Sequence, residues 1–168
     1  AEKAKRLRWF GIDRVKKQKG IWENDIDEIG YKYQMTDIAA AMGLTSLDYF
    51  EAQLGHRRKL LQKYQNRLDG IPGIKLVNKN DADYFHAAWL CTVLVKNRAG
   101  LEIKLKENNI ESNQVHYRND KYKIFSRFSK NELTNMDNLE DEYLVLPLHS
   151  RVSVSDVDRI CDVINNGW

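Results

Sequence analysis

A lysine between two tyrosines forms the first stretch of the sequence whose residue types could bind a ligand. Tyr31, Lys32 and Tyr33 come shortly before Thr36, a residue suited to begin a helix. The lysine offers a cation, and the start of a helix offers backbone N–H groups, so this stretch is suited to an anion. An aromatic loop that only packs against its neighbours would have the same composition, and both interpretations stand.

Polar and titratable side chains also gather where two predicted strands end. His116, Tyr117 and Arg118 lie at the end of an alternating stretch, and His149 follows a short apolar one. Clusters at strand ends often line ligand sites, which makes these four residues candidates. An ordinary surface turn explains the first three equally well, and a lone histidine beside a core strand is usually structural.

Basic residues concentrate in the first twenty positions, although the whole chain of 168 residues has a formal net charge of only +3. This concentration indicates either a solvated helix face or a surface for phosphates or nucleic acid. The small net charge makes nucleic acid the weaker candidate. The residues are Lys3, Lys5, Arg6, Arg8, Arg14, Lys16, Lys17 and Lys19.

The common catalytic and metal-binding motifs do not occur in the sequence. We find no glycine-rich phosphate loop and no serine nucleophile elbow. The four histidines lack metal-ligand spacing, so we assign no metal ligand and no catalytic residue. Cys91 and Cys161 lie in apolar patterns and are expected to be buried free thiols, which favours a cytoplasmic protein. We see neither a membrane-spanning segment nor a secretion signal.

The elements before residue 70 are predicted to be mainly helical. Residues 1–10 have helical spacing, residues 11–35 are irregular, and Thr36 is the expected N-cap of a long apolar stripe that ends near residue 70. Gly43 and Gly55 favour a break, so we predict two successive helices.

The second half of the chain predicts a small α/β domain of the α+β type, in which helices pack on a small sheet. We expect residues 1–70 to end a larger domain with its connecting long helices, and residues 71–168 to form the small domain. The expected strands are residues 74–77, 86–95, 112–117 and 144–148; the expected helices are residues 99–108, 121–128, 138–143 and a last one that Ser153 begins.

Taken in order, these stretches resemble the DegT/DnrJ/StrS family of sugar aminotransferases, and the resemblance covers essentially the whole chain. Residues 30–41, GYKYQMTDIAAA, are similar to a family stretch that reads G-Y-N-Y-x-M-T-x-I-x-A-A. The other matching segments are residues 1–8, the helix with Arg57, Arg58 and Tyr64, residues 86–89, residues 109–117, and residues 146–160.

The resemblance implies the carboxy-terminal part of a fold-type-I enzyme that depends on pyridoxal phosphate and works as a homodimer. Such enzymes transfer an amino group, typically from glutamate, to a keto sugar carried by a nucleotide, for cell-surface polysaccharide or lipopolysaccharide. The family lysine that binds the cofactor covalently would lie upstream. We therefore expect this chain alone to be inactive, not to bind the cofactor, and to expose apolar residues around Leu47 and Phe50.

The resemblance also implies roles for single residues. Lys32, which replaces the family asparagine, and Tyr31 would bind the cofactor phosphate, whereas His116, Tyr117 and His149 would face the substrate. Arg118 would contact a nucleotide diphosphate, as would the basic stretch around Arg8, Arg14 and Lys16. The alternative is a non-catalytic module of the same fold that binds a nucleotide sugar or a protein.

Overall fold

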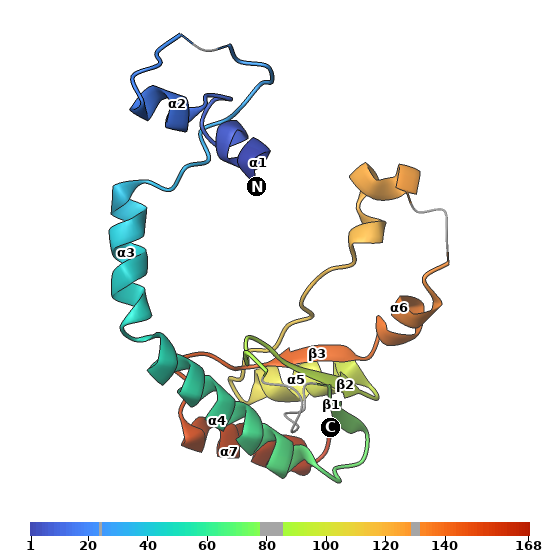
Figure 1. Ribbon diagram of the computed structural model, residues 1–168. Coiled ribbons are helices and arrows are strands. Elements are labelled where there is room, and N and C mark those ends of the chain that lie inside the picture. The colour runs from blue at the N-terminus through green and yellow to red at the C-terminus, as the bar shows by residue number, and fades with distance from the viewer. Residues whose placement is uncertain (24, 78–85, 129–131) are drawn as a thin grey trace. The chain divides into compact units, whose positions relative to one another are not determined.

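The computed structural model describes residues 1–23, 25–77, 86–128 and 132–168, and these form two compact units (Figure 1). The first unit is Ala1–Tyr49 and the second is Phe50–Trp168. The boundary falls before α4 (Phe50–Leu68), not near residue 70 as the sequence suggested. The reason is that Leu60, Leu61, Tyr64 and Leu68 of α4 are buried in the core of the second unit.

The first unit contains α1 (Glu2–Leu7), α2 (Arg14–Gln18) and α3 (Asp37–Leu47). We predicted no helix in residues 11–35, where α2 occurs. This helix begins at Asp13, whose carboxylate accepts hydrogen bonds from the backbone N–H groups of Val15 and Lys16 at 3.0 and 3.2 Å. A helix of five residues is too short to show a repeating hydrophobic pattern, so its N-cap residue marks its start instead.

The end of α1 holds the loop that carries Tyr31 and Lys32. The Tyr31 N–H donates to the Leu7 carbonyl at 2.7 Å, and the Tyr33 N–H donates to the Arg8 carbonyl at 2.9 Å. Gly30 allows this approach, because a Cβ atom at its position would lie only 2.0 Å from the Gly11 nitrogen.

Helix α3 begins as predicted at Thr36, whose hydroxyl accepts a hydrogen bond from the Ala39 N–H at 3.2 Å. None of its residues is buried within the chain, and Ile38, Met42 and Leu47 are largely exposed. The exposure expected at Leu47 and Phe50 is therefore confirmed. Two successive helices are also confirmed, but the break lies at Asp48 and Tyr49, and both glycines lie inside helices.

The second unit is built on an antiparallel sheet in the order β1 (Ile74–Leu76), β2 (Cys91–Val95) and β3 (Tyr143–Leu146). Helices α4, α5 (Arg98–Glu107) and α7 (Val154–Asn165) share one hydrophobic core with it (Figure 1). Alternate residues of the central strand, Cys91, Val93 and Val95, are buried, while Thr92 and Leu94 are half-buried. One face of the central strand is therefore fully buried and the other is only partly covered.

The chain between α5 and β3 is the part that the sequence predicted least well. Residues 112–117 form no strand, and only Asn113 pairs with β3, through Val145. Two 3₁₀ helices, Asn119–Lys121 and Lys123–Phe128, replace the predicted helix 121–128. Helix α6 (Thr134–Leu139) precedes the predicted position 138–143, because Tyr143 already belongs to β3.

Helix α7 begins with the capping box that the sequence predicted. The Ser153 hydroxyl accepts a hydrogen bond from the Asp156 N–H at 3.1 Å, and the Asp156 carboxylate accepts one from the Ser153 N–H at 2.8 Å. The hydrogen bonds that the Ser153 N–H and hydroxyl donate to the Asp156 carboxylate hold the pKa of Asp156 below its usual value. Val157, Ile160, Cys161 and Ile164 form the buried face of the helix.

Candidate functional site

Lys32 extends its side chain over two aromatic rings of the first unit. Its Nζ atom lies 4.1 Å from the centre of the Trp9 ring and 5.7 Å from that of Phe10. Within the described residues, no carboxylate pairs with this ammonium group, and the side chain is exposed. The rings therefore orient the cation without neutralising it, which leaves its charge for an anionic ligand.

Tyr31 adjoins this cation along the chain. Its ring stacks on that of Tyr33 with 5.3 Å between the ring centres, and half of its surface is exposed. The stretch singled out from the sequence thus presents an ammonium group and a phenol on one tethered loop. Phosphate oxygens accept hydrogen bonds from both kinds of donor.

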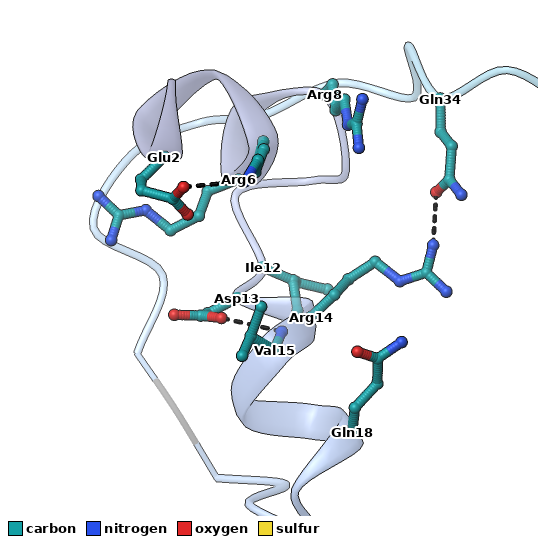
Figure 2. Close-up of a pocket in the computed structure, with 10 residues that line it drawn as sticks. Glu2, Arg6, Arg8, Ile12, Asp13, Arg14, Val15, Gln18 and Gln34 are labelled. Carbon is teal, nitrogen blue, oxygen red and sulfur yellow. Dashed lines mark hydrogen bonds and ion pairs between the residues drawn. The ribbon is translucent and has the colours of Figure 1, made fainter.

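A cavity of about 410 Å³ lies beside α1 and α2 in the same unit (Figure 2). Arg8 and Arg14, two of the three residues of the predicted phosphate-binding stretch, line it, whereas Lys16 does not. The complete lining is Glu2, Lys5, Arg6, Arg8, Ile12, Asp13, Arg14, Val15, Gln18 and Gln34.

His149 and His116 both lie beside the exposed side chain of Trp89 in the second unit. The Trp89 and His116 ring centres are 5.7 Å apart, and His149 lines with Trp89 a pocket of about 350 Å³. Glu111, Ser112 and Asn113 supply further polar groups to this pocket. Its other apolar lining residues are Leu90, Val115, Val145, Leu146, Pro147 and Leu148. Two candidate residues from distant parts of the sequence are thus brought to one place.

Hydrogen bonds from the core fix the backbone around this pocket. Arg57 Nη1 donates to the carbonyl of Trp89 at 3.3 Å, and the Tyr143 hydroxyl donates to the carbonyl of His116 at 2.6 Å. The Arg151 N–H donates to Nδ1 of His149 at 3.2 Å, so in neutral His149 the proton lies on Nε2. That Nε2–H group is a donor for a ligand in the pocket.

Arg118 has a different environment from the one we predicted. Its side chain is buried and forms ion pairs with Asp120 at 2.7 Å, Asp137 at 2.6 Å and Glu140 at 3.1 Å. A diphosphate approaching Arg118 would therefore meet negative charges. A substrate contact of Arg118 stays a prediction, and the geometry favours a role in holding residues 119–121 to α6 and to Glu140, which follows it.

Two of the carboxylates around Arg118, those of Asp120 and Glu140, are held in their charged form. The Arg118 guanidinium lowers the pKa of Asp120, and Lys121, helped by Arg118, lowers the pKa of Glu140. The hydrogen bonds that Arg118 donates to Asp120 and Asp137 in turn raise the pKa of its guanidinium. Tyr117 lies next to this cluster, half-exposed, with its ring edge-on to Tyr122 at 5.1 Å.

Trp89 and Arg57 also shape the pocket that His149 lines, although neither was selected from the sequence as a ligand. Trp89 had been assigned to an apolar strand, but it precedes β2 and its ring is largely exposed. Arg57 lies within the predicted apolar helical stripe, and it supports the Trp89 backbone. A cation inside the apolar helical pattern was therefore the signal for a hydrogen-bond partner elsewhere in the fold.

The described residues contain no group of three histidine, cysteine, aspartate or glutamate side chains arranged to hold a metal ion. Over the same ranges, every helix is too short or too polar to cross a bilayer.

Comparison with known proteins identifies a family for the chain. The model of the DegT/DnrJ/EryC1/StrS aminotransferase family matches residues 1–165, which include most of both compact units. Similar curated proteins include GDP-perosamine synthase of Escherichia coli O157:H7, 28% identical over 83% of this chain and 38% of that protein. Another is UDP-4-amino-4,6-dideoxy-N-acetyl-beta-L-altrosamine transaminase of Campylobacter jejuni serotype O:2, 25% identical over 97% of this chain and 44% of that protein.

A solved structure extends the similarity to the fold. AtS13 from Actinomadura melliaura superposes with a TM-score of 0.89 at 28% identity, over 99% of this chain and 44% of that chain. The chain thus spans less than half the length of the relatives it matches. The resemblance and the fold class predicted from the sequence are both confirmed, and the chain belongs to the DegT/DnrJ/EryC1/StrS aminotransferase family.

Proposed function

We propose that this chain is the carboxy-terminal portion of an aminotransferase that uses pyridoxal phosphate to aminate a nucleotide-linked keto sugar. The observation that carries the proposal is the family match, which runs through both units from residue 1 to residue 165. Two similar proteins bear names that specify GDP- or UDP-linked amino sugars, which supports a nucleotide sugar as the substrate. The product would serve the synthesis of cell-surface polysaccharide or lipopolysaccharide.

The loop of the first unit would hold the cofactor through its phosphate. Pyridoxal phosphate, when bound, supplies the electron sink for amino-group transfer, and the protein supplies position and charge. The exposed ammonium of Lys32, with no carboxylate partner among the described residues, fits a phosphate dianion. The Tyr31 phenol offers a second donor on the same loop.

The pocket beside Trp89 would hold part of the sugar substrate. The exposed indole face suits the apolar face of a sugar ring, and the Nε2–H group of His149 suits a sugar hydroxyl. His116 lies against the same indole, and Tyr117 follows it along the chain. These side chains bind and orient; the proposal assigns them no proton transfer.

Glutamate as amino donor, a homodimer and a cytoplasmic location complete the proposal. The exposed apolar face of α3 supports assembly with a further protein surface, because Ile38, Met42 and Leu47 would be covered there. Free thiols at Cys91 and Cys161 support a reducing compartment.

The test uses the protein encoded by the longest reading frame that contains this chain, purified in the presence of pyridoxal phosphate. We expect transfer of the amino group from glutamate to a GDP- or UDP-linked 4-keto sugar, followed by mass spectrometry of the product. Lys32→Met should weaken cofactor binding, measured by absorption of the bound cofactor. Lys75→Met, an exposed lysine of β1, is the matched control and should leave it unchanged.

Each part of the proposal has an outcome that contradicts it. No transfer to any keto sugar tested would remove the proposed activity, and the non-catalytic module would then be the better explanation. Equal effects of the two lysine variants would remove Lys32 from the cofactor site. The chain of 168 residues alone should neither transfer an amino group nor bind the cofactor tightly.

A further inference from the structure

Ala88 has a backbone conformation that its residue type disfavours. Its φ is +50°, in the left-handed region that glycine adopts readily and other L-residues adopt rarely. The residue is fully buried, so it belongs to the core of the second unit and not to a solvated turn. Such conformations persist only where the surrounding structure holds them, and they concentrate at ligand sites. Contacts around residues 86–89 must therefore offset the cost of this conformation.

Side chains of α4 and of His86 hold this turn. Arg57 Nη1 donates to the carbonyl groups of Ala88 at 3.4 Å and of Trp89 at 3.3 Å. Arg58 Nε donates to the carbonyl of His86 at 2.9 Å, and Nδ1 of His86 accepts from the Ala88 N–H at 2.8 Å. The histidine thus holds the peptide plane before the Ala88 Cα atom, and Arg57 holds the plane after it. Together these hydrogen bonds set both backbone dihedral angles of Ala88.

The turn delivers the indole of Trp89 to the surface. This ring lines the pocket of about 350 Å³ that contains His149 and also a second pocket of about 520 Å³ that Arg57 lines. Because the ring is largely exposed, packing contributes little to its position, and the backbone before it must supply most of its order. A rotation at Ala88 would turn the indole away from His116, whose ring centre lies 5.7 Å from it.

From these contacts we propose that Arg57 is a positioning residue for the sugar: it holds Ala88 in the left-handed conformation and so fixes the direction of the Trp89 indole before the ligand binds. The inference rests on the proposed function for the identity of the ligand, whereas the action of Arg57 on the turn does not depend on it. Without Arg57, the left-handed conformation of Ala88 would be disfavoured by roughly tenfold. The apparent affinity for a ligand of the ordered indole would fall by the same factor.

The first measurement is fluorine NMR of the chain carrying 5-fluorotryptophan at its four tryptophan positions. Trp89→Phe identifies the Trp89 signal, which should be single and sharp in the unchanged chain. Arg57→Met keeps an aliphatic stem and removes the donors. It should shift or broaden the Trp89 signal, because the turn then exchanges between conformations. The signals of Trp9, Trp22 and Trp168 should stay in place.

Three further variants separate the effect on the turn from a general structural role. Glycine adopts positive φ readily, so adding Ala88→Gly to Arg57→Met should return the Trp89 signal towards its original position. Arg57→Lys keeps a cationic donor and should restore the signal in part, and it provides the same test if the methionine variant does not fold. Arg67→Gln is the matched control: it removes an arginine from the same helix, about 15 Å farther along, with two ion pairs to α7. It should leave the Trp89 signal unchanged.

The second measurement is the kinetics of the protein encoded by the longest reading frame that contains this chain, with a GDP- or UDP-linked 4-keto sugar. Arg57→Met should raise KM for the sugar by about tenfold and leave kcat within about twofold. The reason is that the indole orients the sugar and makes no bond to the reacting atoms. Arg67→Gln should leave both constants unchanged.

Several results would overturn the proposal. One is an unchanged Trp89 signal in the folded Arg57→Met variant, and another is an equal displacement in Arg67→Gln. Failure of Ala88→Gly to restore the signal would show that Arg57 does not act through the turn. A fall in kcat at constant KM would show that it does not act on sugar placement. Absence of amino transfer, with the NMR signals as expected, would refute the proposed function alone.

Discussion

Replacing Tyr64 by phenylalanine removes one hydroxyl from the core of the second unit and leaves the ring in place. Tyr64 is fully buried, and its hydroxyl donates to the carbonyl of Pro147 at 2.9 Å. This hydrogen bond joins α4 to the segment that follows β3, two residues before His149. The substitution should therefore lower stability and loosen the backbone of the Trp89 pocket.

The expected loss of stability depends on the Pro147 carbonyl, which loses its hydrogen-bond donor. A neutral hydrogen bond contributes about 1 kcal/mol net, and a buried carbonyl left without its donor costs about 1–3 kcal/mol. Pro147 is half-buried, so water can reach its carbonyl and the low end applies. We expect a loss of about 1.5 kcal/mol in the free energy of unfolding. With a urea dependence of about 1.5 kcal/mol per molar, the midpoint falls by about 1 M.

Urea unfolding followed by circular dichroism measures this shift, and Tyr49→Phe is the control. Tyr49 is largely exposed, and its hydroxyl makes no hydrogen bond to the described part of the chain, so its midpoint should hardly move. Equal midpoints for the Tyr64 variant and the unchanged chain would refute the reasoning, because the hydroxyl would then contribute nothing.

Three further predictions concern other parts of the second unit. Burial raises the pKa of the Cys91 and Cys161 thiols, the latter to about 12, so on raising the pH the unfolded chain loses these protons before the folded chain does. The free energy of unfolding should therefore fall above about pH 8.5, by up to about 1.4 kcal/mol per pH unit for each thiol. A flat pH profile in urea unfolding would contradict this. Ser153→Ala removes the cap of α7 and should cost about 1 kcal/mol in the same assay, whereas no change would show that the cap is dispensable. Arg118→Gln should remove the cation that Asp120, Asp137 and Glu140 share and so speed hydrogen exchange in residues 119–128. Arg118→Lys should restore part of the protection, and unchanged exchange in both variants would show that these ion pairs do not hold the segment.

Local chemistry explains why the sequence predicted the helix starts so well. Thr36 and Ser153 cap helices through atoms of their own residues and of residues three positions later, so the pattern is complete within a few letters of sequence. The predicted break between the two helices was placed at Gly43 and Gly55, but a glycine only weakens a helix and does not have to end it. Gly43 and Gly55 have open space where a Cβ atom would be, and packing of the second unit sets the boundary instead.

Long-range pairing explains what the sequence did not predict. The alternation of residues 112–117 is real, but a strand needs a partner, and within this stretch only Asn113 pairs with β3. Arg118 was a candidate ligand for a diphosphate because two of its three carboxylate partners, Asp137 and Glu140, are far along the chain. His116 and His149 were found as separate candidates, while their common neighbour Trp89 becomes visible only once β2 and β3 are paired.

The bridge at Asn113 also has a consequence for how the chain aggregates. The Val145 N–H donates to the Asn113 carbonyl at 2.9 Å, so the outer edge of β3 is partly occupied, and β1, the opposite edge, has only three residues. Short or covered edges give an incoming strand few backbone groups to pair with, which disfavours fibres of the amyloid type. Association of this chain would proceed instead through the apolar side chains of α3, and mild detergent should reverse it.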